Sequence, residues 1–446
     1  MLQQVDVTRR LAHYVAVTRW EDVPSQVRHQ AKRSLINLFA VALAGCRTDA
    51  IDISLASLKE FSGGRQATLI GRAERIDALS AAFLNAAAAN VHDFCDTHLA
   101  TVIHPTAPVA PALLALSEFR DVSGPDLLLA FTLGNEVQAR IGLAISPHHY
   151  DKGWHITSTC GVFGAAAGSG KLLGLDEHQL VSALGTASTQ SSGLCECLGW
   201  PAKSVSVGNA ARNGLWSALL AAKGFDGPAE PLAGRQGFYN AMGDTPDLSL
   251  VTKGLGESWE LMATSYKPYP CGFVIHPVLD CVLDWRRDHR PAEVTRVVVR
   301  GNPLLAHRTD RPEISTGRES QVSVQHAVAA ALVFGRAGIK EFADASVNDP
   351  RVLALRRKVE VVRDPSLSTI AAAVEITADG KVHQLSQSAA RGSDVNPLSD
   401  QDLEQKLRTV AASWDARHNI QPLIDAVWSL EKSADVSGLA ALVAPR

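Results

Sequence analysis

The stretch TSTCGVFGAAAGSGKLLGL, residues 157–175, is rich in glycine, alanine and serine. Side chains this small allow two backbones to approach each other closely, so we expect a central, tightly packed helix here. Each glycine makes a helix about 1 kcal/mol less stable than alanine would, and tertiary packing must compensate for that loss. The stretch therefore predicts a fold in which other helices pack around this segment.

Helical patterns continue on the N-terminal side of this stretch. Residues 25–45 repeat apolar side chains at helical spacing, and residues 78–91 are rich in alanine. Residues 105–119 and 123–145 have the same character. The chain up to residue 265 is therefore expected to be mostly helical.

The pattern changes after residue 265. Residues 293–301 and 358–364 have the composition of strands. Residues 370–389 predict a hairpin, for which Asp379-Gly380 supplies the turn. Strands confined to this section indicate a separate α+β unit.

Helix returns at residues 398–413, where Ser399 is the expected N-cap, and the tail from residue 419 is again helical. We therefore predict a mainly α protein. Its large helical domain spans residues 1–265 and is completed by residues 398–446, and a smaller α+β lid domain, residues 266–397, is inserted between them. Clefts between domains are common places for small-molecule sites.

The composition limits the possible partners. The chain has 446 residues, 46% of them hydrophobic, which suggests two domains with substantial cores. A net charge of −3 gives no basic surface for nucleic acid, and no run of about 18 apolar residues marks a membrane span. The seven scattered cysteines fit reduced thiols, and the N-terminal residues lack the apolar stretch of a signal peptide. We expect a cytoplasmic protein that binds neither nucleic acid nor a membrane.

HDFCDTHLATVIHP, residues 92–105, carries an unusual concentration of ionisable side chains between apolar runs. It follows one predicted helix and precedes another, and a loop on a rigid frame is a favoured place for reactive groups. Asp93 can orient a neighbour or act as a base, and Thr97 can donate a hydrogen bond to a ligand carboxylate. His104 can carry a proton near neutral pH.

Two other interpretations of this loop remain open. In the first, its aspartates cap turns and its histidines are solvated. In the second, the loop binds a metal ion, although the order of its residues matches no specific zinc or iron pattern. The possible ligands would be His92, Asp93, His98 and His104.

The stretch SPHHYDKGWHITST, residues 146–159, lies between two predicted helices and contains Tyr150 and His155. Thr157 or Ser158 is expected to cap the glycine-rich helix, whose N-terminus would favour a bound anion. This position makes His155 a candidate site residue. The alternative is a structural histidine.

Three more candidates lie in later stretches. Lys203 precedes a small-residue helix, and Lys267 lies at the expected domain junction beside a Pro-x-Pro segment. Enclosed lysines hold carboxylates or act as bases with a lowered pKa, whereas most lysines are simply solvated. His326 begins an apolar helix and has the alternative of a buried side chain bonded to the backbone.

Two short motifs resemble cofactor-binding patterns but do not match them. GSGK at residues 168–171 lacks the first glycine and the final Ser or Thr of a phosphate loop, so we do not expect nucleotide binding. Cys195 and Cys197 are not joined by a third suitably spaced cysteine, so we do not expect an iron–sulfur cluster.

Five blocks of the sequence resemble the MmgE/PrpD family, which includes 2-methylcitrate dehydratase, cis-aconitate decarboxylase and iminodisuccinate epimerase. The blocks are HDFCDTH…HPTAP, GWHITSTCGVFGAAAGSGKLLGL, AKSVSVGNAARNG, KPYPCGFVIHPVLD and SVQHAVAAALV. They stand in the family's order over nearly the whole chain. The resemblance implies a helical domain, a smaller lid domain, a homodimer, and a site between the domains that needs neither metal nor organic cofactor.

The resemblance also implies roles for individual residues. His326 stands where the decarboxylase has a tyrosine, and Tyr150 belongs to a neighbouring block. Gly272 stands where the decarboxylase pattern has an active-site histidine, and His276 is no replacement for it. Cys95 and Ser204 depart from a common aspartate and proline. By position, the family's active-site residues fall on Asp93, Thr97, His104, His155, Lys203 and Lys267.

These residues suit the chemistry of a carbon acid. Removing a proton beside a carboxylate of a small polycarboxylate gives an enediolate, which lysines and histidines stabilise, and the base would be one of His104, His155 or Lys203. Because of Gly272, we expect epimerisation of a dicarboxylate such as iminodisuccinate. Dehydration of a 2-methylcitrate-like acid and cis-aconitate-type decarboxylation are the alternatives. A metal-dependent hydrolase and a non-catalytic binding protein rank lower.

Overall fold

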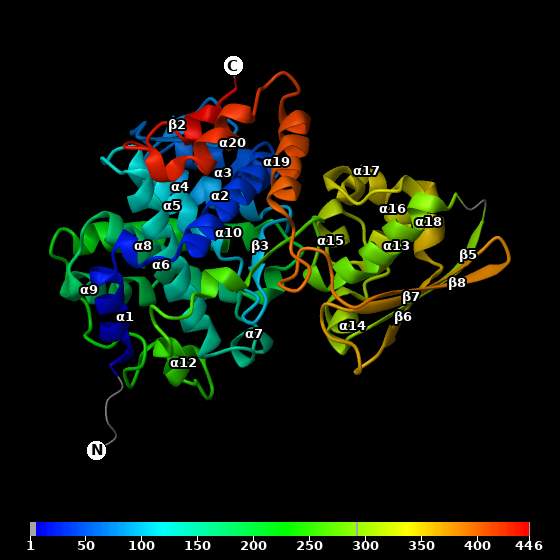
Figure 1. Cartoon of the computed structure of the whole chain (residues 1–446), viewed down its shortest axis with the longest axis horizontal. Helices are drawn as coiled ribbons and strands as arrows, with labels where there is room; N and C mark the ends of the chain where they lie inside the picture. Colours follow the sequence, from blue (N-terminus) through cyan, green and yellow to red (C-terminus); the bar gives the residue numbers. More distant parts are fainter. Residues whose placement is uncertain (1–5, 291–292, 446) are drawn as a thin grey trace.

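A computed structural model describes residues 6–290 and 293–445 (Figure 1). Its helices up to residue 260 are α1 (Val7–Val17), α2 (Ser25–Gly45), α3 (Asp49–Lys59), α4 (Ala78–Asn90), α5 (Thr106–Ser117), α6 (Gly124–Leu143), α7 (His148–Asp151), α8 (Ile156–Leu172), α9 (Glu177–Ser188), α10 (Ala202–Ala221), α11 (Phe238–Met242) and α12 (Ser249–Thr252). The later helices are α13 (His276–Asp288), α14 (Pro303–Thr309), α15 (Gly317–Ser320), α16 (Val324–Phe334), α17 (Asp344–Val347), α18 (Pro350–Arg356), α19 (Asp400–Trp414) and α20 (Gln421–Trp428).

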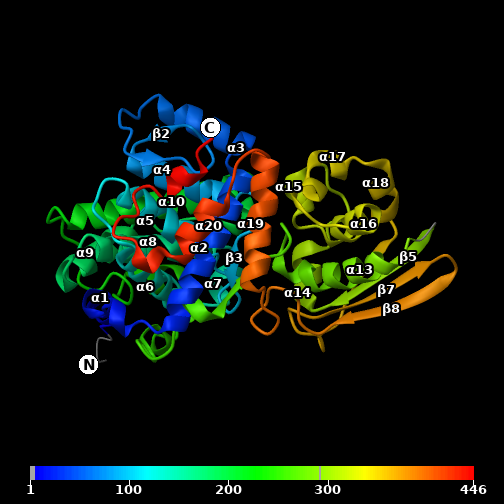
Figure 2. The same ribbon diagram turned by 45° about the horizontal axis from the view of Figure 1, so that its top comes forward.

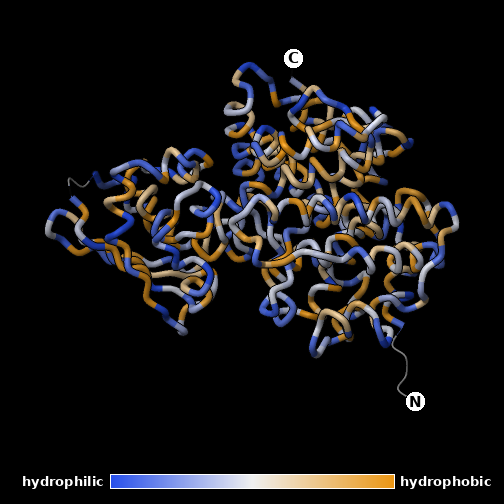
Figure 3. The backbone as a smooth tube through the Cα atoms, turned by 180° about the vertical axis from the view of Figure 1, so that it is seen from behind, coloured by the Kyte–Doolittle hydropathy of each residue, from blue (hydrophilic) through white to orange (hydrophobic). Residues whose placement is uncertain are grey.

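The buried apolar side chains form two separate cores. The first draws on residues 7–266 and again on residues 398–443, and we call it the helical part. The second draws on residues 271–378, and we call it the α+β part. The two parts lie side by side in Figures 1 and 2, and Figure 3 shows hydrophobic segments running through both. The prediction of a mainly α protein is confirmed.

Helix α8 lies at the centre of the helical part. It packs against α5, α6, α9 and α10, and its residues from Ile156 to Gly170 are all buried. A Cβ atom on Gly164 would lie 2.7 Å from the main-chain oxygen of Gly134, and one on Gly214 would lie 2.6 Å from that of Val162. These crossings need glycine because no side chain fits between the backbones. The tightly packed central helix predicted from the sequence is confirmed.

The α+β part contains a four-stranded sheet in the order β6-β5-β7-β8, in which only the β5–β6 pair is parallel. Helix α13 packs on β7 and β8 and also on α16 (Figure 2). The predicted hairpin is present, and its turn residues Asp379 and Gly380 both have positive φ, at 49° and 74°. The strands are β5 (Val294–Gly301), β6 (Val359–Arg363), β7 (Ala372–Ala378) and β8 (Lys381–Gln387).

Short strands fix loops of the helical part. β1 (Ala67–Thr68) pairs with β2 (Arg75–Ile76), and β3 (Asp96–His98) pairs antiparallel with β4 (Thr264–Tyr266). The segment at 92–105, expected to be a loop throughout, therefore contains a strand. The β3–β4 pairing places this segment beside residues 264–266, which directly precede Lys267.

The C-terminal segment returns to the helical part. Ser399 caps α19 as predicted, because its side chain accepts a hydrogen bond from the Asp402 amide. Helix α19 packs along α2 and lies at the boundary between the two parts (Figures 1 and 2). Among residues 6–290 and 293–445, no single helix has both the length and the apolar character of a membrane span. Only α2 and α3 taken together do, and they meet at 85°.

Candidate active site

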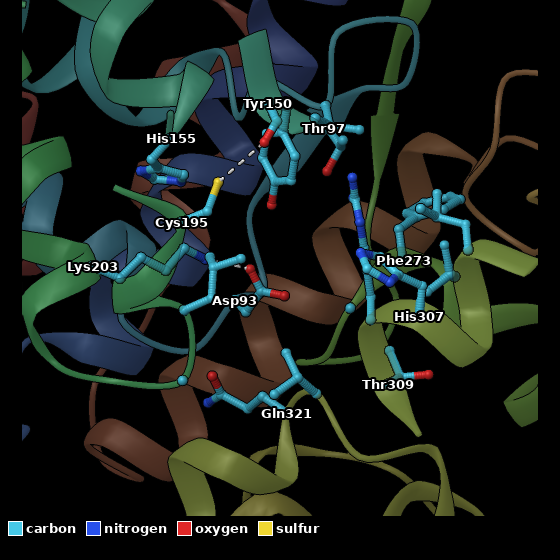
Figure 4. A pocket seen from close by; sticks show the side chains of 18 of the residues that line it. Asp93, Thr97, Tyr150, His155, Cys195, Lys203, Phe273, His307, Thr309 and Gln321 are labelled. Carbon is cyan, nitrogen blue, oxygen red and sulfur yellow. Dashed lines mark hydrogen bonds and ion pairs between the residues drawn. The ribbon is translucent and has the colours of Figure 1, made fainter. Parts of the chain in front are cut away.

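A cavity of about 510 Å³ is lined by residues of both parts. Lys203 and Asp93 contribute from the helical part, while Phe273 and His307 contribute from the α+β part across from them (Figure 4). Seven of the residues expected at the site line this cavity. They are Asp93, Thr97, His104, Tyr150, His155, Lys203 and Lys267.

Asp93 is the centre of an ion-pair cluster. Its carboxylate lies 2.6 Å from Lys203 Nζ and 3.0 Å from Lys267 Nζ, and its main-chain oxygen lies 3.1 Å from Lys267 Nζ. Burial opposes ionisation of Asp93, but the two lysines and His104 together hold its pKa well below the ordinary value. Its φ of 50° is in the left-handed region, which aspartate tolerates better than most residues. The backbone is thus bent to direct this carboxylate at two lysines from distant segments.

His104 is held as a neutral imidazole. Its Nδ1 lies 2.8 Å from the main-chain oxygen of Asp96 and 3.2 Å from Thr97 Oγ1, so Nδ1 carries the proton. Burial and the charges of Lys267 and Lys203 keep its pKa well below the ordinary value. The unprotonated Nε2 lies 3.6 Å from Asp93 Oδ1. This nitrogen can accept a proton, and the carboxylate beside it would stabilise the resulting imidazolium.

His155 is a second buried imidazole at the cavity. Its Nδ1 lies 2.9 Å from Ser158 Oγ and 3.3 Å from Ser206 Oγ. Burial and the charge of Lys203 lower its pKa to about 3, so it is neutral at pH 7. Because Nδ1 is occupied by hydroxyl groups, Nε2 is the nitrogen left for a ligand.

The expected cap of α8 is wrong. His155, and neither Thr157 nor Ser158, is the N-cap residue, and both hydroxyl residues lie inside the first turn. Their side chains have other partners, because Thr157 Oγ1 accepts from the His104 amide at 3.1 Å and Ser158 Oγ bonds His155. The hydroxyl groups therefore orient the two site histidines.

Tyr150 lies in α7 and faces the cavity (Figure 4). Burial raises the pKa of its phenol above the ordinary value, so the hydroxyl stays protonated. The guanidinium carbon of Arg308, from α14 of the α+β part, lies 4.4 Å from the centre of its ring. The ring thus holds a cation from the opposite part of the molecule.

His326 does not reach the cavity, contrary to the prediction. It is buried in α16, where Nε2 donates a 2.8 Å hydrogen bond to the main-chain oxygen of Glu341. Ser323 caps the helix and fixes this register, because its side chain accepts from the His326 amide. His276 is likewise buried, 3.3 Å from the main-chain oxygen of Cys271, and does not line the cavity.

The loop histidines do not converge in the way that the metal interpretation required. His92 Nε2 bonds the main-chain oxygen of Ala44 at 3.1 Å, and His98 Nε2 lies 3.2 Å from Glu260. Within the described ranges, no group of three His, Cys, Asp or Glu side chains has the arrangement of a metal site. Only His104 of the three histidines lies beside Asp93.

The sequence reasoning missed three arginines of the cavity wall. Arg308, Arg311 and Arg318 come from α14, α15 and the loop between them. The segment 307–318 carries these three guanidinium groups in one short stretch, which was a readable signal. Its position opposite the lysines was not readable, because it depends on how the two parts pack.

Lys406 was also missed. It extends from α19 below the site, and its Nζ lies 2.8 Å from each of Asn37 Oδ1, the Phe94 main-chain oxygen and the Lys267 main-chain oxygen. Its ammonium group also lies 3.6 Å from the centre of the Phe94 ring. Burial lowers its pKa to about 7. Lys406 therefore ties together the backbone segments that carry Asp93 and Lys267.

The fold and cavity define a two-core, mainly α protein with a cavity lined by lysine, arginine and histidine side chains. Residues 9–251 match the model of the MmgE/PrpD N-terminal domain, and residues 269–431 match that of the MmgE/PrpD C-terminal domain. The chain therefore belongs to the MmgE/PrpD family.

Similar proteins are named as enzymes. Cis-aconitate decarboxylase of Homo sapiens is 30% identical, over 94% of this chain and 90% of its own length. The cis-aconitate decarboxylase-like protein oryM of Aspergillus oryzae is 29% identical, over 98% of this chain and 97% of its own length. Cis-aconitate decarboxylase of Aspergillus terreus is 28% identical, over 98% and 96%.

Proposed function

We propose that this protein is an enzyme that removes a proton from the carbon next to a carboxylate of a small polycarboxylate. The observation that carries the proposal is the cluster of Asp93, Lys203 and Lys267 beside two neutral histidines. General base catalysis needs a positioned group that is unprotonated at neutral pH, and His104 and His155 are both in that state.

The charge of the cavity favours a substrate with several carboxylates. Asp93 and Asp151 are the acidic residues of its wall. Against these two carboxylates stand five cations, so the wall carries three surplus positive charges before any histidine is protonated. A polyanion of small size neutralises this surplus. The five cations are Lys203, Lys267, Arg308, Arg311 and Arg318.

The lysines retain donors for the substrate. An ammonium group has three N–H donors; within the described residues, Lys267 uses two on Asp93 and Lys203 uses one. The remaining N–H groups are available to a substrate carboxylate, which becomes an enediolate when its neighbouring carbon loses a proton. Fixed donors stabilise this developing charge more than the ground state. The Thr97 hydroxyl, which accepts from His104, has its own hydrogen left to donate.

His104 is the preferred base. Its Nε2 lacks a proton and faces Asp93. When Nε2 takes up a proton, the imidazolium forms an ion pair with the Asp93 carboxylate. His155 has the same neutral state and is held by Ser158 of α8 and Ser206 of α10. Both imidazoles are neutral and can serve as the base, while the protonated hydroxyl of Tyr150 lines the same cavity and can serve as the acid.

Epimerisation of a dicarboxylate, such as iminodisuccinate, is the first candidate outcome. It requires removal of a proton by one group and return of a proton by another, which His104 as the base and the protonated hydroxyl of Tyr150 as the acid can provide. Gly272 supports this candidate, because it lines the cavity at the position where the resemblance gives the decarboxylases a histidine.

A lyase reaction is the second candidate outcome. The names of the similar proteins favour it, since they are cis-aconitate decarboxylases or decarboxylase-like. In a dehydratase, the carbanion left by proton removal expels a β-hydroxyl group, which takes up a proton and leaves as water. In a decarboxylase, cleavage of the carbon–carbon bond releases carbon dioxide and leaves the carbanion, which then takes up a proton. Both candidates pass through a carbanion beside a carboxylate, and the same lysines would stabilise it.

The test is proton NMR of a panel of di- and tricarboxylates incubated with the enzyme in heavy water. Deuterium at the carbon next to a carboxylate, with inversion and no alkene, indicates an epimerase; a new alkene or carbon dioxide indicates a lyase. His104→Gln and Lys203→Met should each lower the rate by about 100-fold or more. His178→Gln, at an exposed residue of α9, is the control. No exchange and no product with any compound would refute the proposal.

A further inference from the structure

Arg308 and Arg318 extend from the α+β part toward the helical part on the wall of the cavity. Arg308 reaches Tyr150 of α7. Arg318 Nη2 lies 3.3 Å from both the main-chain oxygen of Trp200 and Ser204 Oγ, at the start of α10. Both contacts cross from one core to the other.

Neither guanidinium has a carboxylate partner within 4.0 Å among the described residues. Two other arginines of the α+β part do have one: Arg296 lies 2.6 Å from Glu360 and Arg336 lies 2.6 Å from Glu341. A cation in a partly enclosed wall is costly when no anion balances it. The cavity therefore places two unbalanced guanidinium groups where a ligand can reach them.

Arg318 is the more enclosed of the two. Its contacts are all with neutral acceptors, the third being Gln321 Oε1 at 3.5 Å from Nη1. Its Nε is buried and has no hydrogen-bond partner among the described groups. Burial lowers the pKa of Arg318, while the charge of Asp93 opposes that shift. A bound carboxylate would supply the missing negative charge.

Arg308 is held without using its hydrogen bonds. The Tyr150 ring supports it by a cation–π contact, and its guanidinium donates no hydrogen bond to another described residue. The planar fork of five N–H donors is thus free for a planar acceptor. Carboxylate is the acceptor that matches this geometry in two-point contact.

We propose that Arg308 and Arg318 form a carboxylate-binding subsite that takes a second carboxylate of the substrate, remote from the one held by Lys203 and Lys267. The subsite rests on the proposed function in taking the substrate to be a polycarboxylate. It accounts for selection by number of carboxylates: a monocarboxylate fills the lysine side alone, whereas a di- or tricarboxylate spans the cavity to the arginines.

The experiment is calorimetric titration of the full chain with propionate, succinate and tricarballylate at one fixed ionic strength. The variants are Arg308→Gln and Arg318→Gln, and Arg300→Gln, at the exposed end of β5, is the matched control. Loss of a charge-assisted contact weakens binding by about 10- to 100-fold. We expect that loss for succinate and tricarballylate with both variants, and a change of less than about twofold for propionate.

The outcomes separate the subsite from the proposed function. Equal weakening of all three acids, or no weakening of the two larger ones, overturns the subsite. If the larger acids bind through the arginines but no acid exchanges a proton, the subsite stands and the proposed function falls. Thermal unfolding checks that each variant is folded. Should Arg318→Gln unfold, Arg308→Gln decides alone, because the Arg308 guanidinium forms no hydrogen bond or ion pair with the described residues and stacks on the Tyr150 ring.

Discussion

The ammonium nitrogen of Lys406 lies 2.8 Å from the main-chain oxygen of Lys267 and as close to that of Phe94. Phe94 directly follows Asp93, so one side chain from α19 fixes both members of the 3.0 Å Asp93–Lys267 ion pair. Asn37 of α2 supplies the third acceptor and anchors the group to the helical part.

Replacing Lys406 with methionine should therefore disturb the site as well as the fold. The substitution leaves three acceptors without a donor, so we expect a loss of stability of about 2–4 kcal/mol in chemical denaturation. We also expect weaker succinate binding in calorimetry, because Asp93 and Lys267 lose their fixed separation. Lys432→Met, at an exposed residue near the C-terminus, is the control. A destabilised variant with unchanged binding would show that Lys406 serves the fold alone.

Asp93→Asn should separate binding from chemistry. Without the carboxylate, Lys203 and Lys267 lose their ionic partner, so small polyanions should bind about 10-fold more tightly. Proton exchange should fall by about 100-fold, because no charge stabilises protonated His104. Calorimetry and NMR in heavy water measure the two effects. Asp151→Asn removes a carboxylate of the wall that pairs with neither lysine, and it should change both quantities little. Weaker polyanion binding by Asp93→Asn would contradict this account.

Gly272→His should introduce a new side chain into the cavity. The φ of Gly272 is −55°, and a Cβ atom there would meet its nearest neighbours, Gln321 and Thr309, at 3.8 Å. The backbone therefore accepts histidine without strain. If the missing histidine decides between epimerase and decarboxylase, the variant should release carbon dioxide from cis-aconitate at a rate at least about 10-fold above the parent. Gly272→Ala is the control. Equal rates for the two variants would mean that this position does not select the reaction.

Acid should destabilise the protein through its buried histidines. Burial lowers the pKa of His155 and His276 to about 3, and that of His92, His149 and His326 to about 4. The unfolded chain takes up protons near pH 6.5 and the folded chain only below these values. Stability is therefore fully present above about pH 6.5 and falls as the pH drops toward 4 and then 3.

Thermal unfolding between pH 7.5 and 4 measures this loss. His326→Gln should flatten the dependence on pH, because it removes a group that lies away from the cavity and takes up its proton only on unfolding. His178→Gln, at an exposed residue, should leave the slope unchanged. A steeper slope for His326→Gln would contradict the assignment.

Much of the fold was predictable because its signals are local. The glycine-rich α8, the cap at Ser399 and the turn at Asp379-Gly380 each depend on neighbouring residues. The Asp93 and Lys203 segments were also recognisable, since each places a polar group between apolar runs. The contact between their side chains was not, because 110 residues separate them.

The misses have a common physical cause. His326 lies in one of the blocks that resemble the family, but its side chain bonds the main-chain oxygen of Glu341 and does not reach the cavity. Arg318 and Lys406 look like ordinary surface residues in the sequence. Only the packing of distant segments places Arg318 in the cavity wall and Lys406 against the main-chain oxygen of Lys267. The partners of Arg318 in the helical part and those of Lys406 are more than 100 residues away, and such a separation leaves no periodic signal in the chain. The partner of His326 is 15 residues away, but it is a main-chain oxygen and so has no mark in the sequence.

The return of α19 to α2 has a consequence for synthesis on the ribosome. The helical part is completed only by residues 398–443, which are translated after the whole α+β part. A nascent chain in which Lys406 has not yet been translated lacks the hydrogen bonds from Lys406 to the main-chain oxygens of Phe94 and Lys267. The contacts that hold Asp93 and Lys267 in place are therefore completed last. A chain released before α19 is translated lacks them.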